Sequence, residues 1–139
     1  MRVVVDINVL LDGMLEREPH APAAVKLLSH IERGTIAGHL CASSVDTLYY
    51  LLCREREHQT AQEILEAILT LHDIVPVDGD VIHSAFHLGW SDLEDAIIHQ
   101  AARKAGIHII VTHDQSFGSG SVITVSAAEA IALASSSQR

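Results

Sequence analysis

The sequence predicts a single α/β domain, built on a central parallel sheet of four to five strands with helices on both faces. Two observations predict this fold. Short apolar runs rich in β-branched residues, at positions 3–5 (VVV) and 107–112 (IHIIVT), indicate strands buried on both sides. Segments with apolar residues at helical spacing alternate with such runs, as in parallel α/β proteins. The length of 139 residues, with 48% hydrophobic and 19% charged residues, fits one ordinary globular domain.

The first half of the chain is predicted to hold two strands and three helices. The strands cover residues 3–5 and 36–42, and the helices cover residues 9–15, 21–33 and 45–54. The second helix is expected to end at Gly34, because glycine tolerates the left-handed conformation common at helix C-termini. Ser43 and Ser44 are expected to cap the third helix, because a serine hydroxyl can accept a bond from a free N–H group of the first turn.

The second half continues the alternation of strands and helices. The strands cover residues 74–77, 107–112 and 122–125, and the helices cover residues 61–71, 80–88, 93–105 and 127–134. Asp80 is expected to cap one helix, and Ser91 or Asp92 to begin the next. The sequence shows no internal repeat and no linker between domains. We therefore predict one domain over residues 1–134 and a disordered tail over residues 135–139.

Charge and composition exclude several functional classes. The formal net charge is −9, whereas a protein that holds nucleic acid by phosphate neutralisation is usually basic. A polyanionic substrate would need a bound cation or a local basic patch. The N-terminus lacks a basic segment followed by a long apolar one, and no apolar run approaches ~18 residues. These features predict a cytoplasmic protein with no contact to the membrane.

Cysteine and histidine give no zinc-binding pattern. Cys41 and Cys53 are expected to be buried, reduced thiols. The histidines are scattered, without HxxxH or HExxH spacing, so each is expected at the surface or its boundary and not as a metal ligand.

Carboxylates gather where the carboxyl edge of the predicted sheet would lie. The acids concerned are Asp6, Asp46, Asp92, Glu94, Asp95 and Asp114. Helix dipoles and turns can explain most of them singly, but Asp6 directly follows a buried strand and needs a partner. Clustered carboxylates repel one another unless a proton or a cation intervenes. Hard oxygen ligands suit Mg²⁺ or Mn²⁺, which can promote phosphodiester cleavage.

Three motifs, VVVDINVLLD, SDLEDAIIHQAARKAG and IIVTHDQSF, make the whole chain resemble the PIN-domain family of metal-dependent ribonucleases, which includes VapC-like toxins. The resemblance implies an endoribonuclease that acts on RNA with Mg²⁺ or Mn²⁺, a small antitoxin protein as partner, and a homodimer. The implied catalytic and metal-binding acids are Asp6, Asp95 and Asp114. Asp92 is implied as a further metal ligand, with Asn8 and Thr112 as supporting residues.

Two positions depart from the family's pattern. Ile7 replaces a hydroxyl residue of the opening motif, and Thr47 stands where the family usually has a glutamate. Asp46 is the neighbouring acid and a candidate ligand, although one helical residue is a rotation of about 100°. These departures support an alternative, a weakened PIN-like module that only binds RNA or protein. A haloacid dehalogenase-like phosphatase is disfavoured, because Asn8 replaces its second aspartate and Lys104 lies in a predicted helix.

Overall fold

Five parallel strands form one sheet in the computed structural model, which describes residues 1–137. The strands are β1 (Arg2–Val5), β2 (Ala37–Cys41), β3 (Asp73–Val75), β4 (Ile109–Val111) and β5 (Ile123–Val125). Their order across the sheet is β3-β2-β1-β4-β5, and every neighbouring pair is parallel. The central position of β1 places its carboxyl end between those of β2 and β4. The predicted fold class is confirmed.

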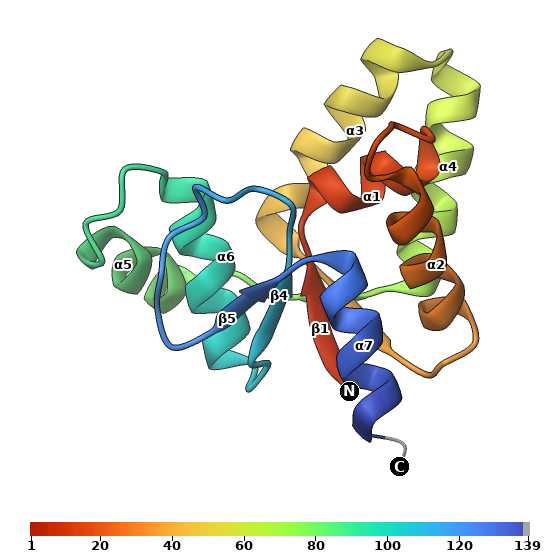
Figure 1. The fold of residues 1–139 in the computed structure, drawn as a ribbon. Helices are drawn as coiled ribbons and strands as arrows, with labels where there is room; N and C mark the ends of the chain where they lie inside the picture. Colours follow the sequence, from red (N-terminus) through yellow and green to blue (C-terminus); the bar gives the residue numbers. More distant parts are fainter. Residues whose placement is uncertain (138–139) are drawn as a thin grey trace.

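Helices cover both faces of the sheet. They are α1 (Ile7–Met14), α2 (Ala21–Glu32), α3 (Val45–Glu55), α4 (His58–Leu71), α5 (Gly79–His87), α6 (Leu93–Lys104) and α7 (Ala127–Ser137), with a 3₁₀ turn at Ala42–Ser44. Figure 1 shows α5 and α6 on one side of the sheet and α1, α2 and α7 on the other. None of the helices within residues 1–137 combines the length and apolar character that a bilayer crossing requires.

The alternation of side chains along β1 divides the interior into two cores. Val3 and Val5 pack into a large core with side chains of α1 to α4 and α7. Val4 points to the opposite face and packs with Ile98 of α6 and Ile110 of β4. Both sides of β1 are therefore buried, as three consecutive valines predict.

The structure corrects several local predictions. Asp78, and not Asp80, caps α5, because its side chain accepts the Val81 N–H at 2.9 Å. Ser44 stands at the N-cap of α3 without a capping bond from its side chain. Residues 135–137, predicted as part of a disordered tail, continue α7, and residues 138–139 lie outside the described part.

Buried polar side chains are more frequent than the sequence led us to expect. His39, His72 and His99 are 8%, 3% and 2% exposed, so they belong to the interior and not to the surface or its boundary. Cys41 is buried as predicted, but Cys53 is exposed on α3. An interior histidine is tolerated where a backbone group accepts its ring N–H, as the Ile68 carbonyl does for His72 Nδ1 at 2.8 Å.

Candidate active site

The turn from β1 into α1 fixes the position of the first acid. Asp6 is the N-cap of α1, and its Oδ1 accepts the N–H of Ile7 at 2.8 Å. The residue is only 8% exposed. A helix N-terminus favours a carboxylate, because its free N–H groups and its dipole are positive there. Local chain geometry therefore supports an acid at the end of the central strand.

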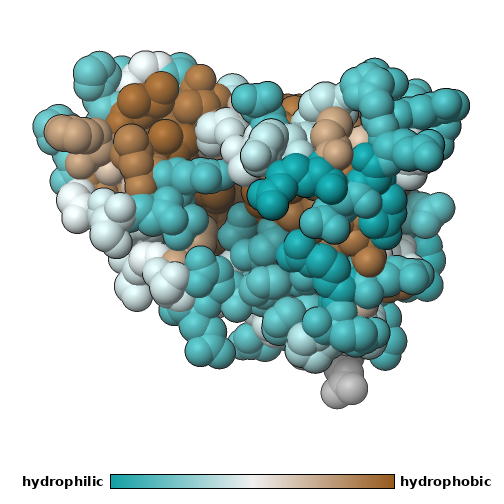
Figure 2. Space-filling view, turned by 90° about the horizontal axis from the view of Figure 1, so that it is seen from above, coloured by the Kyte–Doolittle hydropathy of each residue, from teal (hydrophilic) through white to brown (hydrophobic). Residues whose placement is uncertain are grey.

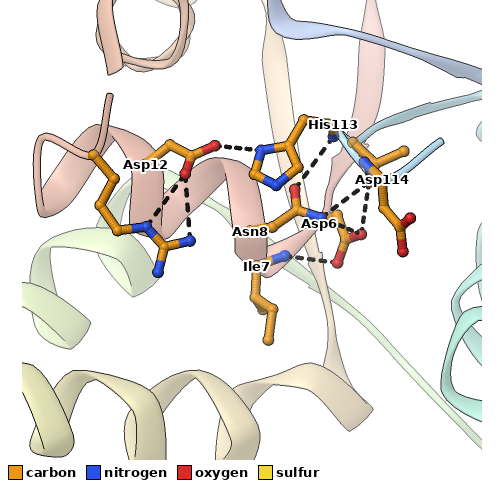
Figure 3. Close-up of polar contacts among 8 residues, drawn as sticks. Asp6, Ile7, Asn8, Asp12, His113 and Asp114 are labelled. Carbon is orange, nitrogen blue, oxygen red and sulfur yellow. Dashed lines mark hydrogen bonds and ion pairs between the residues drawn. The ribbon is translucent and has the colours of Figure 1, made fainter. Parts of the chain in front are cut away.

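Two polar side chains hold the second oxygen of Asp6. Thr112, which follows β4, donates its hydroxyl to Asp6 Oδ2 at 2.9 Å. Asn8 Nδ2 lies 3.2 Å from the same oxygen and 3.1 Å from Thr112 Oγ1. Figure 3 shows Asn8 and Asp114 beside Asp6, with the hydrogen bonds that join this group. The structure thus brings Asn8 and Thr112, both expected as supporting residues, into direct contact with the first acid.

Asp114 follows β4, and Ser116 fixes the position of its carboxylate. Its Oδ1 accepts the N–H of Ser116 at 2.9 Å and the Ser116 hydroxyl at 2.6 Å. These two bonds hold the pKa of Asp114 below its usual value, so the group stays ionised. The N–H of Asp114 also donates to Thr112 Oγ1 at 3.1 Å, which links it to the partners of Asp6.

The first turn of α6 brings further carboxylates to these two. Asp92 is the N-cap of α6, and its Oδ1 accepts the N–H of Asp95 at 3.1 Å. Burial, together with the nearby charges of Asp92, Asp6 and Asp114, raises the pKa of Asp95 to about 7. Burial likewise raises the pKa of Asp6, although the Thr112 hydrogen bond lowers it in part. Acids from three separate segments therefore lie within electrostatic reach of one another.

Glu94, expected among the gathering acids but not among the metal ligands, belongs to the same cluster. Burial and the charges of Asp92 and Asp6 raise the pKa of its carboxyl group. Glu94 and Asp6 also act together on Cys41, at the end of β2, whose thiol pKa is raised chiefly by burial. Glu94 thus lies near the carboxyl end of β2. Its place next to Asp95 in the SDLED motif is the sequence feature that could have indicated it.

Asp46 is not part of the cluster. It is exposed in the first turn of α3, and none of the interactions described for Asp6, Asp95 or Asp114 within residues 1–137 involves it. The one-residue offset from Thr47 rotates it away, as helix geometry requires. Its position is that of a helix N-terminal acid, which the dipole favours without any ligand.

The donor set of the cluster fits a hard divalent cation. Asp6, Asp95 and Asp114 offer only carboxylate oxygens, and Asp92 and Glu94 add negative charge close by. Carboxylates that raise one another's pKa are repelling each other, and a bound cation would relieve that repulsion. Oxygen-only sites of this kind suit Mg²⁺ or Mn²⁺ better than softer metals.

The chain matches a known family model and a ribonuclease. The family model described as PIN domain matches residues 2–116, a range that includes Asp6, Asp95 and Asp114. Ribonuclease VapC1 of Aquifex aeolicus (strain VF5) is 26% identical over 121 residues, covering 84% of this chain and 83% of that relative.

Solved structures show the same fold. The crystal structure of VapBC2 from Rickettsia felis, bound to a DNA fragment from its promoter, aligns with a TM-score of 0.70 at 12% identity, covering 91% of this chain and 98% of that chain. The crystal structure of Mycobacterium tuberculosis VapC20, described as a sarcin-ricin loop cleaving toxin, aligns with a TM-score of 0.68 at 18% identity. The alignment covers 83% of this chain and 92% of that chain. At such identities the likeness concerns the fold alone.

The crowding of Asp95 predicts a pH dependence of stability. Its pKa is raised from 3.8 to about 7, so the folded protein binds this proton more tightly than the unfolded chain does. The resulting stabilisation is full at low pH and is lost as the pH rises through about 7. In metal-free protein, the melting temperature of Asp95→Asn should fall less than that of wild type between about pH 5 and pH 8.

The matched control for that measurement is Asp46→Asn, which removes an exposed acid outside the cluster. Its pH profile should parallel the wild type. An Asp95→Asn profile as steep as the wild-type profile would show that Asp95 does not carry the repulsion.

Proposed function

The chain belongs to the PIN domain family, and we propose that it is a divalent-metal-dependent endoribonuclease that hydrolyses RNA phosphodiester bonds. The observation that carries the proposal is that Asp6, Asp95 and Asp114, from three segments of the fold, lie close enough for their charges to act on one another. Ligands of open α/β sheets bind at this edge. The relative from Aquifex aeolicus, described as a ribonuclease, supports the same activity.

The chain's own residues would bind the cation and keep its ligands in position. Mg²⁺ or Mn²⁺, when bound, supplies a Lewis acid for a phosphate oxygen and lowers the pKa of a bound water. Asp6, Asp95 and Asp114 are the residues that would hold it, with Asp92 and Glu94 beside them. The hydrogen bonds of Asn8 and Thr112 fix the direction in which Asp6 Oδ2 points.

The cation also reconciles an acidic protein with a polyanionic substrate. A net charge of −9 and a cluster of carboxylates would repel an RNA phosphate group. A divalent ion in the cluster places positive charge where the phosphate must approach. RNA binding at this site should therefore require the metal as much as cleavage does.

The biological setting that we propose is a toxin–antitoxin pair in the cytoplasm. A VapBC complex is among the solved structures with this fold, which supports a small antitoxin protein as the partner. A catalytically weakened module that binds RNA or protein is the second candidate, favoured by Thr47 in place of the family's glutamate and by the exposed position of Asp46.

We further propose a homodimer, with the exposed apolar side chains of α5 and its surroundings at the interface. Viewed from above, Figure 2 shows apolar side chains gathered on the side of the molecule where α5 and α6 lie. The large exposed side chains there are Ile82 (47%), Phe86 (70%), Leu88 (37%) and Leu93 (46%). A contiguous apolar surface of this kind marks an interaction site more often than it marks ordinary solvent exposure.

Cleavage of RNA tests the proposed activity and its alternative. Asp6→Asn keeps the shape of the N-cap but removes the charge, so it should abolish cleavage in Mn²⁺ without unfolding the protein. Asp46→Asn is the control and should cleave at the wild-type rate, because its side chain lies outside the cluster. The measurement is the initial rate of cleavage of a labelled RNA across a Mn²⁺ titration, with circular dichroism to check folding.

The outcomes separate the two candidate functions. Cleavage that appears with Mn²⁺ and is lost in Asp6→Asn supports the nuclease. RNA binding without cleavage, unchanged by chelators, supports the binding module. Wild-type rates in Asp6→Asn would overturn the assignment of the site.

Size-exclusion chromatography with light scattering tests the dimer. Phe86→Asp places a charge where 70% of the side chain is exposed in the monomer, so it should dissociate the dimer and leave the fold intact. Tyr50→Asp is the matched control, because Tyr50 is 61% exposed on α3, away from this surface. A monomeric wild type, or a Phe86→Asp protein that stays dimeric, would contradict the proposed interface.

A further inference from the structure

Asp12, His20 and His113 form a second group of metal-binding side chains, distinct from the acids of the candidate active site. Each offers one ligand atom, and these atoms lie within 4.8 Å of one another. Asp12 comes from α1, His20 precedes α2, and His113 follows β4. The three are brought together by the fold, since their spacing along the chain matches no metal-binding motif.

The carboxylate of Asp12 is buried and directed at this group. Asp12 is 2% exposed, and a buried carboxylate is costly unless it is paired. Arg17 contacts Oδ1 at 3.3 Å, while Nδ1 of His113 lies 2.5 Å from Oδ2. Figure 3 shows the Asp12 carboxylate and the His113 ring facing each other. The guanidinium of Arg17 thus contacts one oxygen of the carboxylate, and the other oxygen faces the imidazole ring of His113.

The second imidazole lies against the first and is open to solvent. The rings of His20 and His113 stack with centroids 4.2 Å apart and an interplanar angle of 22°. His20 is exposed and makes no capping bond with its side chain, so its ring nitrogens are accessible. A cavity of about 170 Å³ is lined by Asp12, His20 and His113 together with neighbouring apolar residues. An ion can therefore reach the group from the side of His20, whose ring has to turn out of the stack to share that ion with His113, because an imidazole nitrogen binds a metal in the plane of its ring.

We propose that Asp12, His20 and His113 bind one divalent ion of the zinc class, in addition to any hard cation at the acid cluster. Two imidazole nitrogens and one carboxylate oxygen are a common ligand set for Zn²⁺, with water in the fourth position. The ion takes Asp12 Oδ2 and His113 Nδ1 as ligands in place of the hydrogen bond between them. The 2.5 Å separation of these two atoms opens to admit it.

The different donors give the two sites different metal preferences. Imidazole nitrogen suits Zn²⁺, Co²⁺ and Ni²⁺, whereas the oxygen-only cluster suits Mg²⁺ and Mn²⁺. An ion at the second site ties α1, the start of α2 and the segment after β4 to one another. That segment carries Asp114, so an ion at the second site would hold a residue of the candidate active site in position. This proposal stands independently of the proposed ribonuclease activity.

Isothermal titration with Zn²⁺ tests the site in a protein whose acid cluster lacks two of its carboxylates. In Asp95→Asn/Asp114→Asn we expect one Zn²⁺ per chain to bind. Adding His20→Ala should weaken that binding by at least about tenfold, because a ligand is lost. His20 is the residue to remove, because it is exposed and its loss leaves the Asp12 ion pair in place. The visible absorption of bound Co²⁺ should report a site without thiolate.

Controls exclude the other donors of the chain. His108→Ala removes an exposed histidine elsewhere, and Cys53→Ser removes the exposed thiol, so neither should alter the titration. Binding that survives His20→Ala, or that is lost with Cys53→Ser, would overturn the proposal. So would the absence of Zn²⁺ binding in Asp95→Asn/Asp114→Asn, since any binding to the wild type would then belong to the acid cluster.

Discussion

The buried carboxylate of Asp6, at the end of the central strand, is the constraint on which the rest of the site depends. A carboxylate at 8% exposure is stable only with hydrogen-bond donors around it. The chain supplies the Ile7 N–H from the first turn of α1 and the side chains of Asn8 and Thr112. Thr112 can reach Asp6 because β4 pairs in parallel register with β1. The register between β1 and β4 thus determines which side chain contacts Asp6.

The remaining acids make the site unfavourable in the absence of a cation. The pKa of Asp95 is about 7, so this group resists ionisation near neutral pH. Ser116 does the opposite at Asp114, where hydrogen bonds favour the charged form. Carboxylates that raise one another's pKa cluster at functional sites more often than elsewhere in proteins. The two apolar cores stabilise the fold, so it tolerates the repulsion among the carboxylates at this edge of the sheet.

The sequence predicted most of the fold, because strand and helix patterns are local. Positions 3–5 and 107–112 identified the two strands that place Asp6 and Asp114 at one edge. Features that depend on side-chain direction or on distant segments were harder to predict. Asp46 lies exposed and apart from the acid cluster, because one residue along a helix changes its face. Glu94 was named among the gathering acids but not as a metal ligand, although it stands beside Asp95 in the SDLED motif. The contact of His113 with a buried aspartate joins residues about a hundred positions apart, which no spacing rule can detect.

The central claim, that Asp6, Asp95 and Asp114 hold one divalent cation, can be tested directly by diffraction. Crystals grown or soaked with Mn²⁺ allow the metal to be located by its anomalous scattering at the manganese absorption edge. The account predicts a peak at coordination distance from carboxylate oxygens of Asp6, Asp95 and Asp114, with waters completing the shell. A fully occupied Mn²⁺ that contacts none of these three residues, or an empty cluster at saturating Mn²⁺, would contradict it.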